Sequence, residues 1–292
     1  MEKEIISIII LSWNTKDILK NCLRSIEYPK FGKWVFEVIV IDNGSTDGSA
    51  QMVEKDFREA VLVKNKKNLG YGAGNNIGIK KAKGEYLLFL NSDTLIKGDA
   101  IEEMAGFLKL HPDTGMVGPK LLNEDGSDQP SAGKFPGLRV SFVMLFAERF
   151  LGSKFARASY DKIKQVDWVM GAAMMTKKDV VERAGVMDEG IFMYMDEVEW
   201  CYRIKKQGFK IVFLPDPEVI HLWQKSSVSG REAPILNIYK GLIYFYKKHL
   251  PFWKLPVLML MLKVKALTSI FVGVIFNNAY LKKTYAKALK IN

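Results

Sequence analysis

Continuous apolar runs alternate with helical stretches through the first third of the chain. The runs from Ile5 to Leu11, Val35 to Ile41 and Tyr86 to Leu90 are typical of strands covered on both faces. Helices are expected between them at 15–26, 47–57 and 71–83, the second of them entered through Ser45 or Thr46 as its cap. Strands alternating with helices of this length predict right-handed βαβ crossovers. The expected fold class is an α/β domain of the nucleotide-binding type with a mostly parallel central sheet.

The pattern continues less regularly in the second half. Polar residues, glycine and proline from Asn123 to Gly137 predict a mobile loop. The apolar stretch from Leu138 to Phe150 predicts a helix that either packs on the core or opens toward an acceptor. A further helix is expected from a cap at Thr176 to Arg183. A strand from Phe209 to Leu214 is expected to end before a Pro-Asp-Pro turn.

Two of the predicted strands end on polar residues. Asp42 and Asn43 follow one, and Asn91-Ser92-Asp93 follow another. An aspartate after a strand is more often a turn former or a helix cap than a ligand. Because α/β sheets bind ligands at the carboxyl ends of their strands, we nevertheless expect the two acidic ends to lie side by side and form a site. Small residues between Gly70 and Gly78 would let the backbone approach a ligand there.

Two familiar phosphate-binding loops are absent from the sequence. Leu11-Ser12-Trp13-Asn14 stands where a G-x-G-x-x-G turn would follow the first strand, and G-x-x-x-x-G-K-[ST] does not occur. Phosphates would then be bound most simply through a divalent cation at Asp93. A lone histidine such as His221 is more often structural, but a neutral imidazole beside a carboxylate is also a common cation ligand.

Three carboxylates fall in the first turn of one predicted helix: Asp196, Glu197 and Glu199. Helix N-termini favour acidic residues, and Glu199 with Arg203 is an ordinary i,i+4 pair. The functional alternative is that one of the three accepts a proton from a substrate hydroxyl. Asp196, Glu199 and Arg203 share a helix face, whereas Glu197 points about 100° away from Asp196.

The net charge is concentrated at the end of the chain. Residues 231–292 hold eleven basic residues against the single acidic Glu232, so ten of the eleven net positive charges lie there. We therefore expect a nearly neutral domain at 1–230 and a basic tail at 231–292 that faces an anionic partner. Cys22 and Cys201 lack metal-ligand or disulfide spacing and are typical of reduced thiols in a cytosolic protein.

The tail has the composition of amphipathic helices. Glu232 to His249 is expected to be helical, and Leu255 to Phe276 is mostly apolar but contains Lys263 and Lys265. Each lysine would cost about 2.5–3.5 kcal/mol at the centre of a spanning helix, which favours a helix lying in the membrane interface. We expect peripheral attachment to the anionic inner face of the cell membrane from the cytoplasm. A helix pair packed on the domain and a homodimer contact are the alternatives, and no nucleic-acid recognition motif accompanies the charge.

Seven segments carry a resemblance to a known family: SIIILSWN (7–14), VIDNGSTDG (40–48), NLGYGAGNNIG (68–78), GEYLLFLNSD (84–93), DWVMGAA (167–173), DEGIFMYMDEVEWCYR (188–203) and HLWQKS (221–226). In this order and spacing they resemble the family 2 glycosyltransferases of the GT-A fold. Within that family they resemble the rhamnosyltransferase-like branch of bacterial and archaeal cell-surface polysaccharide synthesis. The resemblance implies a nucleotide-sugar donor, a glycan or polyprenyl-diphosphate-linked acceptor, and Mn²⁺ or Mg²⁺.

The resemblance also implies roles for single residues. Those matching nucleotide-binding or sugar-nucleotide positions are Ser12, Asn14, Asp42, Asn43, Asn68, Gly70 and Ser92. Asp93 matches the last carboxylate of a D-x-D type metal motif whose first position is here Asn91, and His221 matches a later histidine near the metal. Asp196-Glu197 stands where the family usually has Glu-Asp, so Glu197 is the expected catalytic base with Asp196 in reserve.

The implied reaction is an inverting transfer in which Glu197 deprotonates an acceptor hydroxyl. The Gln-x-x-Arg-Trp motif of the family's processive polymerases does not occur, so one sugar is expected per encounter. Three alternatives stay open: a polyprenyl-phosphate glycosyltransferase, a nucleotidyltransferase on a similar sheet, and a catalytically inactive membrane scaffold.

Overall fold

One mixed sheet forms the centre of the protein. The computed structural model describes residues 3–27, 33–147, 156–222 and 232–292. The sheet runs in the order β10-β13-β6-β12-β4-β1-β2-β3, with β5 and β7 on its margins. The strands are β1 (Glu4–Ser12), β2 (Trp34–Asp42), β3 (Val61–Lys64), β4 (Tyr86–Asn91), β5 (Thr94–Ile96), β6 (Thr114–Leu122), β7 (Asp128–Gln129), β10 (Lys164–Val166), β12 (Ala173–Lys177) and β13 (Lys210–His221).

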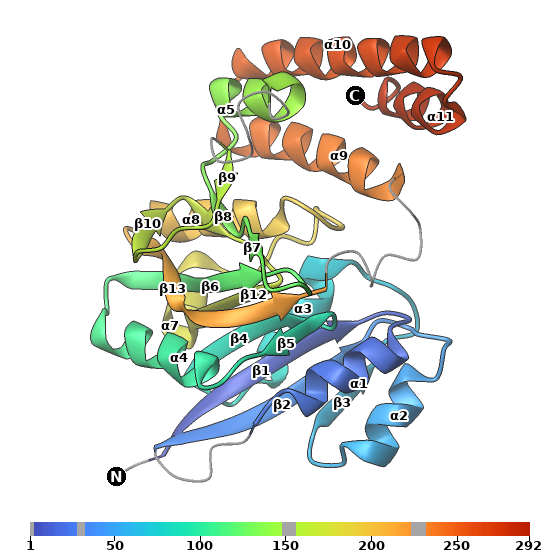
Figure 1. Ribbon diagram of the computed structural model, residues 1–292. Coiled ribbons are helices and arrows are strands. Elements are labelled where there is room, and N and C mark those ends of the chain that lie inside the picture. The colour runs from blue at the N-terminus through green and yellow to red at the C-terminus, as the bar shows by residue number, and fades with distance from the viewer. Residues whose placement is uncertain (1–2, 28–32, 148–155, 223–231) are drawn as a thin grey trace.

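The expected parallel sheet is confirmed in the first half of the chain. Strand β1 pairs in parallel with both β2 and β4, and β2 pairs in parallel with β3. Strand β6 is also parallel to β13, whereas β12 is antiparallel to both of its neighbours. The chain moves outward from β1 to β3 and then returns to the other side of β1 with β4 (Figure 1). The reversal beside β1 is a topological switch point, where α/β sheets bind ligands.

Helices cover both faces of the sheet, which explains the continuous apolar strands. Ile8 and Ile10 of β1 pack with α1 (Lys16–Arg24), α2 (Ser49–Asp56) and α4 (Ala100–Leu110). Ile9, which points the other way, belongs to the core built by α3 (Tyr71–Lys81), α7 (Lys178–Ala184) and α8 (Asp196–Lys206). All three isoleucines are fully buried, as expected for a strand between two helical layers.

Two predicted helix caps are wrong. Helix α2 begins at Ser49, not after Ser45 or Thr46, because Asp47 Oδ1 accepts the Ser49 backbone N–H at 3.0 Å. Thr176 lies inside strand β12 and its hydroxyl donates to the Gly115 carbonyl at 2.5 Å, so helix α7 starts two residues later. In each case a hydrogen bond to another residue decides where the helix begins, and the residue that was expected to cap the helix does not cap it.

The segment expected to be a mobile loop is instead tied into two sheets. Strand β7 pairs with β6, and β8 (Ala132–Gly133) pairs with β9 (Arg157–Ala158) and β11 (Trp168–Val169). Trp168 Nε1 also donates to the Lys134 carbonyl at 3.0 Å. Strand β13 likewise runs on through the Pro-Asp-Pro sequence to His221, with a register shift between Leu214 and Glu218. Both segments have partners distant in sequence, which composition does not reveal.

The C-terminal helices stack on one end of the domain. Helix α9 (Glu232–His249) begins and ends as expected, and α10 (Lys254–Ile275) and α11 (Ala279–Ala288) pack against it and against each other (Figure 1). The expected apolar helix at 138–150 is a short α5 (Leu138–Phe142) followed by a π-helix, Val143–Ala147, both in contact with α10. Residues 148–150 lie outside the described part. Tyr239, Leu242 and Phe245 of α9 share the hydrophobic core of α8.

Candidate active site

The polar strand ends meet around the end of β1. In the sheet register Ser12 lies opposite Asp42 of β2, and Leu11 lies opposite Asn91 of β4. The prediction that the two acidic strand ends lie side by side is therefore wrong, because β1 separates them. The carboxyl ends of all three parallel strands nevertheless lie at the same end of the sheet. The expected nucleotide residues on these strands and Asp93 therefore lie near the switch point.

Hydroxyl groups connect two of the expected nucleotide residues. Ser12 Oγ lies 2.9 Å from Thr15 Oγ1, which in turn donates to Ser92 Oγ at 3.0 Å. All three residues are buried. This chain of hydroxyls fixes the end of β1 against the end of β4.

Asn14 and Asp42 organise the loop after β2. Asn14 has a left-handed backbone (φ 53°), its N–H donates to Ser45 Oγ at 2.9 Å, and its Oδ1 accepts the Thr46 N–H at 2.8 Å. Asp42 Oδ2 accepts the Ser45 N–H at 3.1 Å, while the buried Oδ1 has no hydrogen-bond partner among the described residues. A buried carboxylate oxygen without a partner is costly, so Asp42 Oδ1 is suited to accept a hydrogen bond from a ligand.

Asn43 and Asn68 hold the glycine-rich loop in place. Asn43 Nδ2 donates to Asn68 Oδ1 at 3.2 Å and to the Gly70 carbonyl at 3.1 Å, and Asn68 Oδ1 also accepts the Gly70 N–H. Gly70 has φ +89°, and a Cβ there would lie 2.4 Å from the Phe192 carbonyl oxygen. Only glycine fits this contact, which joins the expected sugar-nucleotide loop to the segment before α8.

The predicted metal ligands lie together although they are 128 positions apart in the sequence. Strand β5 pairs with the end of β13, which brings His221 Nε2 to 3.4 Å from Asp93 Oδ1. His221 Nδ1 lies 2.7 Å from Gln129 Oε1, and Gln129 Nε2 donates to the His221 carbonyl and to Asn123 Oδ1. In neutral His221 this arrangement places the hydrogen on Nδ1 and leaves Nε2 as an acceptor. The rest of the predicted HLWQKS segment, residues 223–226, lies outside the described residues.

Asp93 and His221 fit a divalent cation that is shared with a diphosphate. With Nε2 as an acceptor, two electron-pair donors face each other at 3.4 Å, an arrangement that a cation between them would stabilise. No group of three or more histidine, cysteine, aspartate or glutamate side chains within the described ranges is arranged to hold a metal. Magnesium-type sites commonly use one or two carboxylates and complete their ligand set with water and substrate phosphates.

The paired carboxylates open helix α8 after an unusual backbone turn. Tyr194 (φ 65°) and Met195 (φ 72°) both have left-handed backbone, which is rare for non-glycine residues and frequent at functional sites. Asp196 is 2% exposed and its Oδ2 has no hydrogen-bond partner in the described part of the chain, whereas Glu197 is partly exposed. Burial, and next the charge of Glu197, raises the pKa of Asp196 well above its ordinary value. Burial also raises the pKa of Glu197.

Tyr194 links this pair to the metal ligands. Burial raises the pKa of the Tyr194 phenol, and the negative charges of Glu197, Asp93 and Asp196 raise it further. All three carboxylates therefore lie near enough to Tyr194 for their charges to act on its phenol. Neither Tyr194 nor Gln129 was expected from the sequence. Gln129 falls in the stretch predicted to be a mobile loop, and nothing in the local sequence singles out Tyr194.

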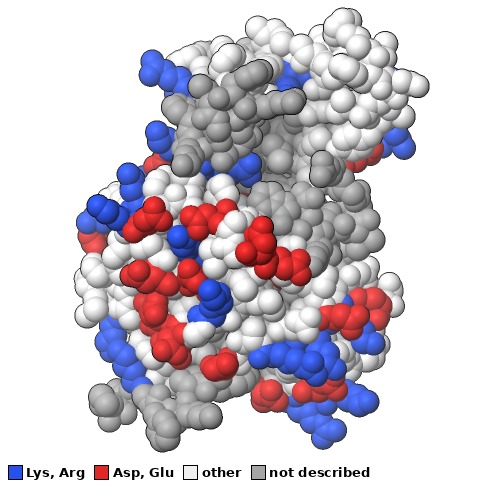
Figure 2. All heavy atoms as spheres, viewed as in Figure 1, with Lys and Arg blue, Asp and Glu red and all other residues white. Residues whose placement is uncertain are grey.

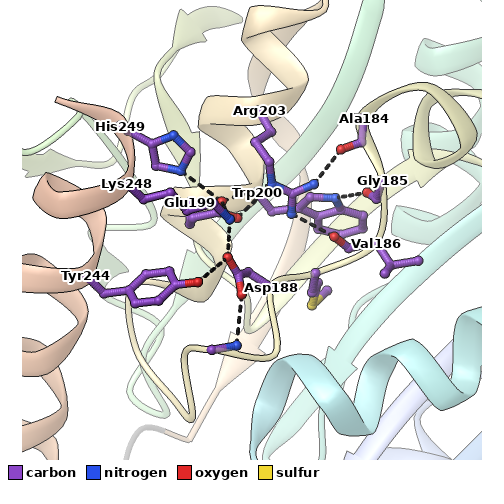
Figure 3. Close-up of polar contacts among 12 residues, drawn as sticks. Ala184, Gly185, Val186, Asp188, Glu199, Trp200, Arg203, Tyr244, Lys248 and His249 are labelled. Atoms are coloured by element: carbon purple, nitrogen blue, oxygen red, sulfur yellow. Dashed lines mark hydrogen bonds and ion pairs between the residues drawn. The ribbon is translucent and has the colours of Figure 1, made fainter.

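Glu199 has a different environment from the other two acidic residues of α8. It is fully buried, and both carboxylate oxygens accept from Arg203 Nε at 2.9–3.0 Å, which confirms the expected i,i+4 pair. Glu199 Oε1 also lies 3.0 Å from Lys248 Nζ and 2.9 Å from His249 Nε2, both on α9 (Figure 3). Lys248 contacts Asp188 as well. Glu199 therefore joins α8 to α9 and is not available to a substrate.

Comparisons with known proteins show the family of this chain. Residues 7–182 match the family model "Glycosyl transferase family 2". The chain is 27% identical over 239 residues to an N-acetylglucosaminyl-diphospho-decaprenol L-rhamnosyltransferase from Mycobacterium tuberculosis, covering 75% of this chain and 77% of that one. It is 27% identical over 227 residues to a low-salt glycan biosynthesis hexosyltransferase from Haloferax volcanii, covering 74% of this chain and 66% of that one.

A solved structure supports the fold over the whole chain. A mannosyltransferase from Pyrobaculum calidifontis in complex with GDP-Man and Mn²⁺ superposes with a TM-score of 0.58 at 18% identity, covering 99% of this chain and 86% of that one. The predicted GT-A architecture and the predicted resemblance to rhamnosyltransferase-like enzymes are both confirmed. The chain belongs to glycosyl transferase family 2 and is a glycosyltransferase of the GT-A fold.

Proposed function

We propose that this enzyme transfers one sugar, with inversion, from a nucleotide-sugar donor to a hydroxyl of a lipid-linked glycan. The observation that supports the proposal is that two sets of carboxylates, Asp93 in one and Asp196 with Glu197 in the other, lie near the switch point of the sheet. Asp93 lies 3.4 Å from His221, and the segment that leads to Asp196 and Glu197 contacts the glycine-rich loop through Phe192 and Gly70. A cation site for a diphosphate and a base for a hydroxyl are the two parts that such a transfer requires.

The protonation of the paired carboxylates supports Glu197 as the base. The pKa of the buried Asp196 is raised well above its ordinary value, so Asp196 takes the proton of the pair and leaves Glu197 ionised. Glu197 is also the more exposed of the two. A neutral neighbour and a partly desolvated carboxylate give Glu197 the higher basicity that proton abstraction from a hydroxyl needs.

The donor would lie across the ends of β1, β2 and β4. Asp42 Oδ1 would accept a hydrogen bond from the nucleoside, because it is buried and has no partner among the described residues. The buried hydroxyls of Ser12 and Ser92 would also face the donor. Asp93 and His221 would hold Mn²⁺ or Mg²⁺, and the chemistry such an ion supplies is neutralisation of the departing diphosphate. Asn43 and Asn68 position the loop through Gly70 and do not themselves need to contact the donor.

The acceptor class is inferred from the relatives and from the tail. The M. tuberculosis relative is named for a glycan on decaprenyl diphosphate. In this chain, α10 is long and apolar enough to cross a membrane by length and composition, but Lys263 and Lys265 interrupt it. Its outward residues include Leu260 and Phe271, which are 64% and 65% exposed. On the face shown in Figure 2 the tail is largely uncharged, whereas the charged side chains gather over the α/β domain.

These features support peripheral attachment of α10 to the anionic inner face of the cell membrane. The apolar side of the helix would enter the interface, and the lysines of the tail would contact lipid head groups. An enzyme held there would meet acceptors whose lipid carriers stay in the membrane.

Titration calorimetry tests the donor half of the proposal. UDP, GDP and dTDP are titrated into the wild-type chain with Mn²⁺ and with EDTA, and one of them should bind only with the cation. Asp93→Ala should abolish the part of the nucleotide binding that depends on Mn²⁺. Asp113→Asn is the matched control, because Asp113 lies at the amino end of β6, whereas the site lies at the carboxyl ends of the parallel strands. Equal binding of the nucleotide by Asp93→Ala and wild type would overturn the metal assignment.

A further inference from the structure

A cleft lies between the segment leading into α8 and one side of α9. It has a volume of about 300 Å³ and is bounded by residues 190–193 on one wall and by Asn237, Lys240, Gly241 and Tyr244 on the other. The four α9 residues are spaced i, i+3, i+4 and i+7, so they form one stripe along the helix. We call this space the α9 cleft.

The α9 cleft and the donor site share a wall. On the donor side, the Phe192 carbonyl accepts the Tyr71 N–H at 2.8 Å and touches Gly70. On the other side, a Cβ added to Gly241 would lie 2.8 Å from Met195 Cβ and 3.0 Å from the Tyr194 carbonyl oxygen. Helix α9 therefore packs directly on the residues that precede Asp196 and Glu197. A molecule in the cleft would lie against the segment that leads to the proposed base, and that segment would separate it from the donor.

Two polar side chains of the cleft, Lys240 and Asn237, have no acceptor among the described residues, whereas the Tyr244 hydroxyl donates to Asp188 at 2.9 Å. Lys240 is exposed and forms no ion pair with any residue that the structure describes. The Asn237 amide likewise makes no hydrogen bond within the described ranges. Lys248, two turns further on, differs because Asp188 and Glu199 neutralise it. No carboxylate is among the described residues that line the cleft, and the nearby Asp188, which accepts from Tyr244, is paired with Lys248. The unpaired charge at the cleft is therefore the ammonium of Lys240, which favours an anion.

The opposite wall is apolar. Ile191, Phe192 and Met193 line it, and Phe192 is 49% exposed. An ammonium and an amide facing aliphatic and aromatic side chains suit a ligand that carries phosphate next to hydrocarbon. A nucleotide-sugar lacks that hydrocarbon part, whereas a lipid-linked glycan has both.

We propose that the α9 cleft binds the acceptor, with Lys240 and Asn237 holding the phosphate that joins its glycan to the lipid carrier. This inference rests on the proposed function and adds to it a site and the recognised group. The glycan would extend from the phosphate toward Glu197, and the lipid would run toward the exposed apolar side of α10. Helix α9 is then a wall of the acceptor site as well as a connection to the tail.

Equilibrium binding of farnesyl diphosphate to the 292-residue chain tests this inference. EDTA is present throughout, so that the diphosphate cannot bind through a cation at Asp93. Lys240→Gln should weaken binding by about tenfold, the effect of one charge-assisted hydrogen bond. Lys247→Gln is the matched control, because it makes the same change on an exposed lysine of α9 about 10 Å along the helix axis, outside the cleft. Its affinity should equal that of the wild type.

Two related probes identify the recognised chemistry. Farnesol and inorganic pyrophosphate should each bind more weakly than farnesyl diphosphate, since each lacks one of the two parts. Equal affinity of wild type and Lys240→Gln for farnesyl diphosphate would overturn the inference. So would inorganic pyrophosphate binding as tightly as farnesyl diphosphate, which would indicate a site for free anions.

Failure of this inference is separable from failure of the proposed function. If a nucleoside diphosphate binds with Mn²⁺ while Lys240→Gln leaves farnesyl diphosphate binding unchanged, only the acceptor site is wrong. If no nucleoside diphosphate binds, the proposed transfer fails whatever the effect of Lys240→Gln.

Discussion

Replacing Glu199 by glutamine should destabilise the protein, although Glu199 lies only two positions from the proposed base. Its carboxylate is fully buried between Arg203, Lys248 and His249. Burial lowers the pKa of His249, so its neutral imidazole donates the hydrogen bond to Glu199. Glutamine keeps the shape of the side chain but removes the negative charge that faces two cations.

The size of the effect follows from the burial of the partners. Removing one member of a buried ion pair costs about 3–5 kcal/mol. The lower end applies here, since Lys248 is 38% exposed and keeps its contact with Asp188. Arg203 also keeps its hydrogen bonds to the Ala184 and Val186 carbonyls (Figure 3). A loss of about 3 kcal/mol lowers the melting temperature of a chain of this size by roughly 6–12 °C.

Thermal unfolding followed by circular dichroism measures this loss. Glu197→Gln is the control, because it makes the same chemical change in the same helix turn at a residue without that ion cluster. We expect Glu197→Gln to keep the wild-type melting temperature and to lose sugar transfer. If Glu199→Gln unfolds like the wild type but no longer transfers sugar, Glu199 is the base and the reasoning is refuted.

Three further predictions follow from the same contacts. Gly241→Ala should lower turnover, measured by steady-state kinetics, because the added methyl group displaces Met195. The control Gly106→Ala on α4 meets open space and should stabilise the protein by about 0.5–1 kcal/mol, measured by urea unfolding. Asp196→Asn should raise the melting temperature at pH 7, and the gain should vanish as the pH falls toward 4. Because the pKa of Asp196 is raised in the folded protein, its contribution to the free energy of unfolding is fully present below the unfolded pKa of about 3.9 and is lost as the pH rises. A gain in melting temperature that is as large at pH 4 as at pH 7 would contradict this prediction. Leu260→Glu should reduce co-sedimentation with anionic vesicles several-fold, whereas Leu110→Glu, at a leucine 78% exposed on the α/β domain, should not.

The sequence predicts the fold well where local pattern and tertiary environment agree. The apolar run of β1 is buried on both faces, and α9 begins and ends where expected. Strand order is not encoded in such local patterns. The expected adjacency of the two acidic strand ends, which carry Asp42 and Asp93, fails because β4 returns to the far side of β1.

The candidate site also combines residues that the sequence predicts with contacts that only the fold reveals. Asp93 and His221 were expected on the basis of the resemblance, and the pairing of β5 with β13 explains how they meet. Glu197 and Glu199 both lie in the first turn of one predicted helix, and the resemblance distinguishes Glu197 as the expected base. The structure separates them because α9 supplies Lys248 and His249 from about 50 positions away. Only the fold brings those two side chains to Glu199 and not to Glu197.

The central claim is that Glu197 removes the proton of an acceptor hydroxyl at a donor site built on Asp93. It is tested most directly by the rate of nucleoside diphosphate release from UDP-, GDP- and dTDP-sugars with Mn²⁺ and a polyprenyl-diphosphate-linked glycan. Wild type, Glu197→Gln and Asp196→Asn are compared after each is shown to bind the nucleotide. We expect release from one donor by the wild type, a loss of at least about 100-fold in Glu197→Gln with donor binding kept, and a smaller loss in Asp196→Asn. Wild-type rates of release from Glu197→Gln would contradict it.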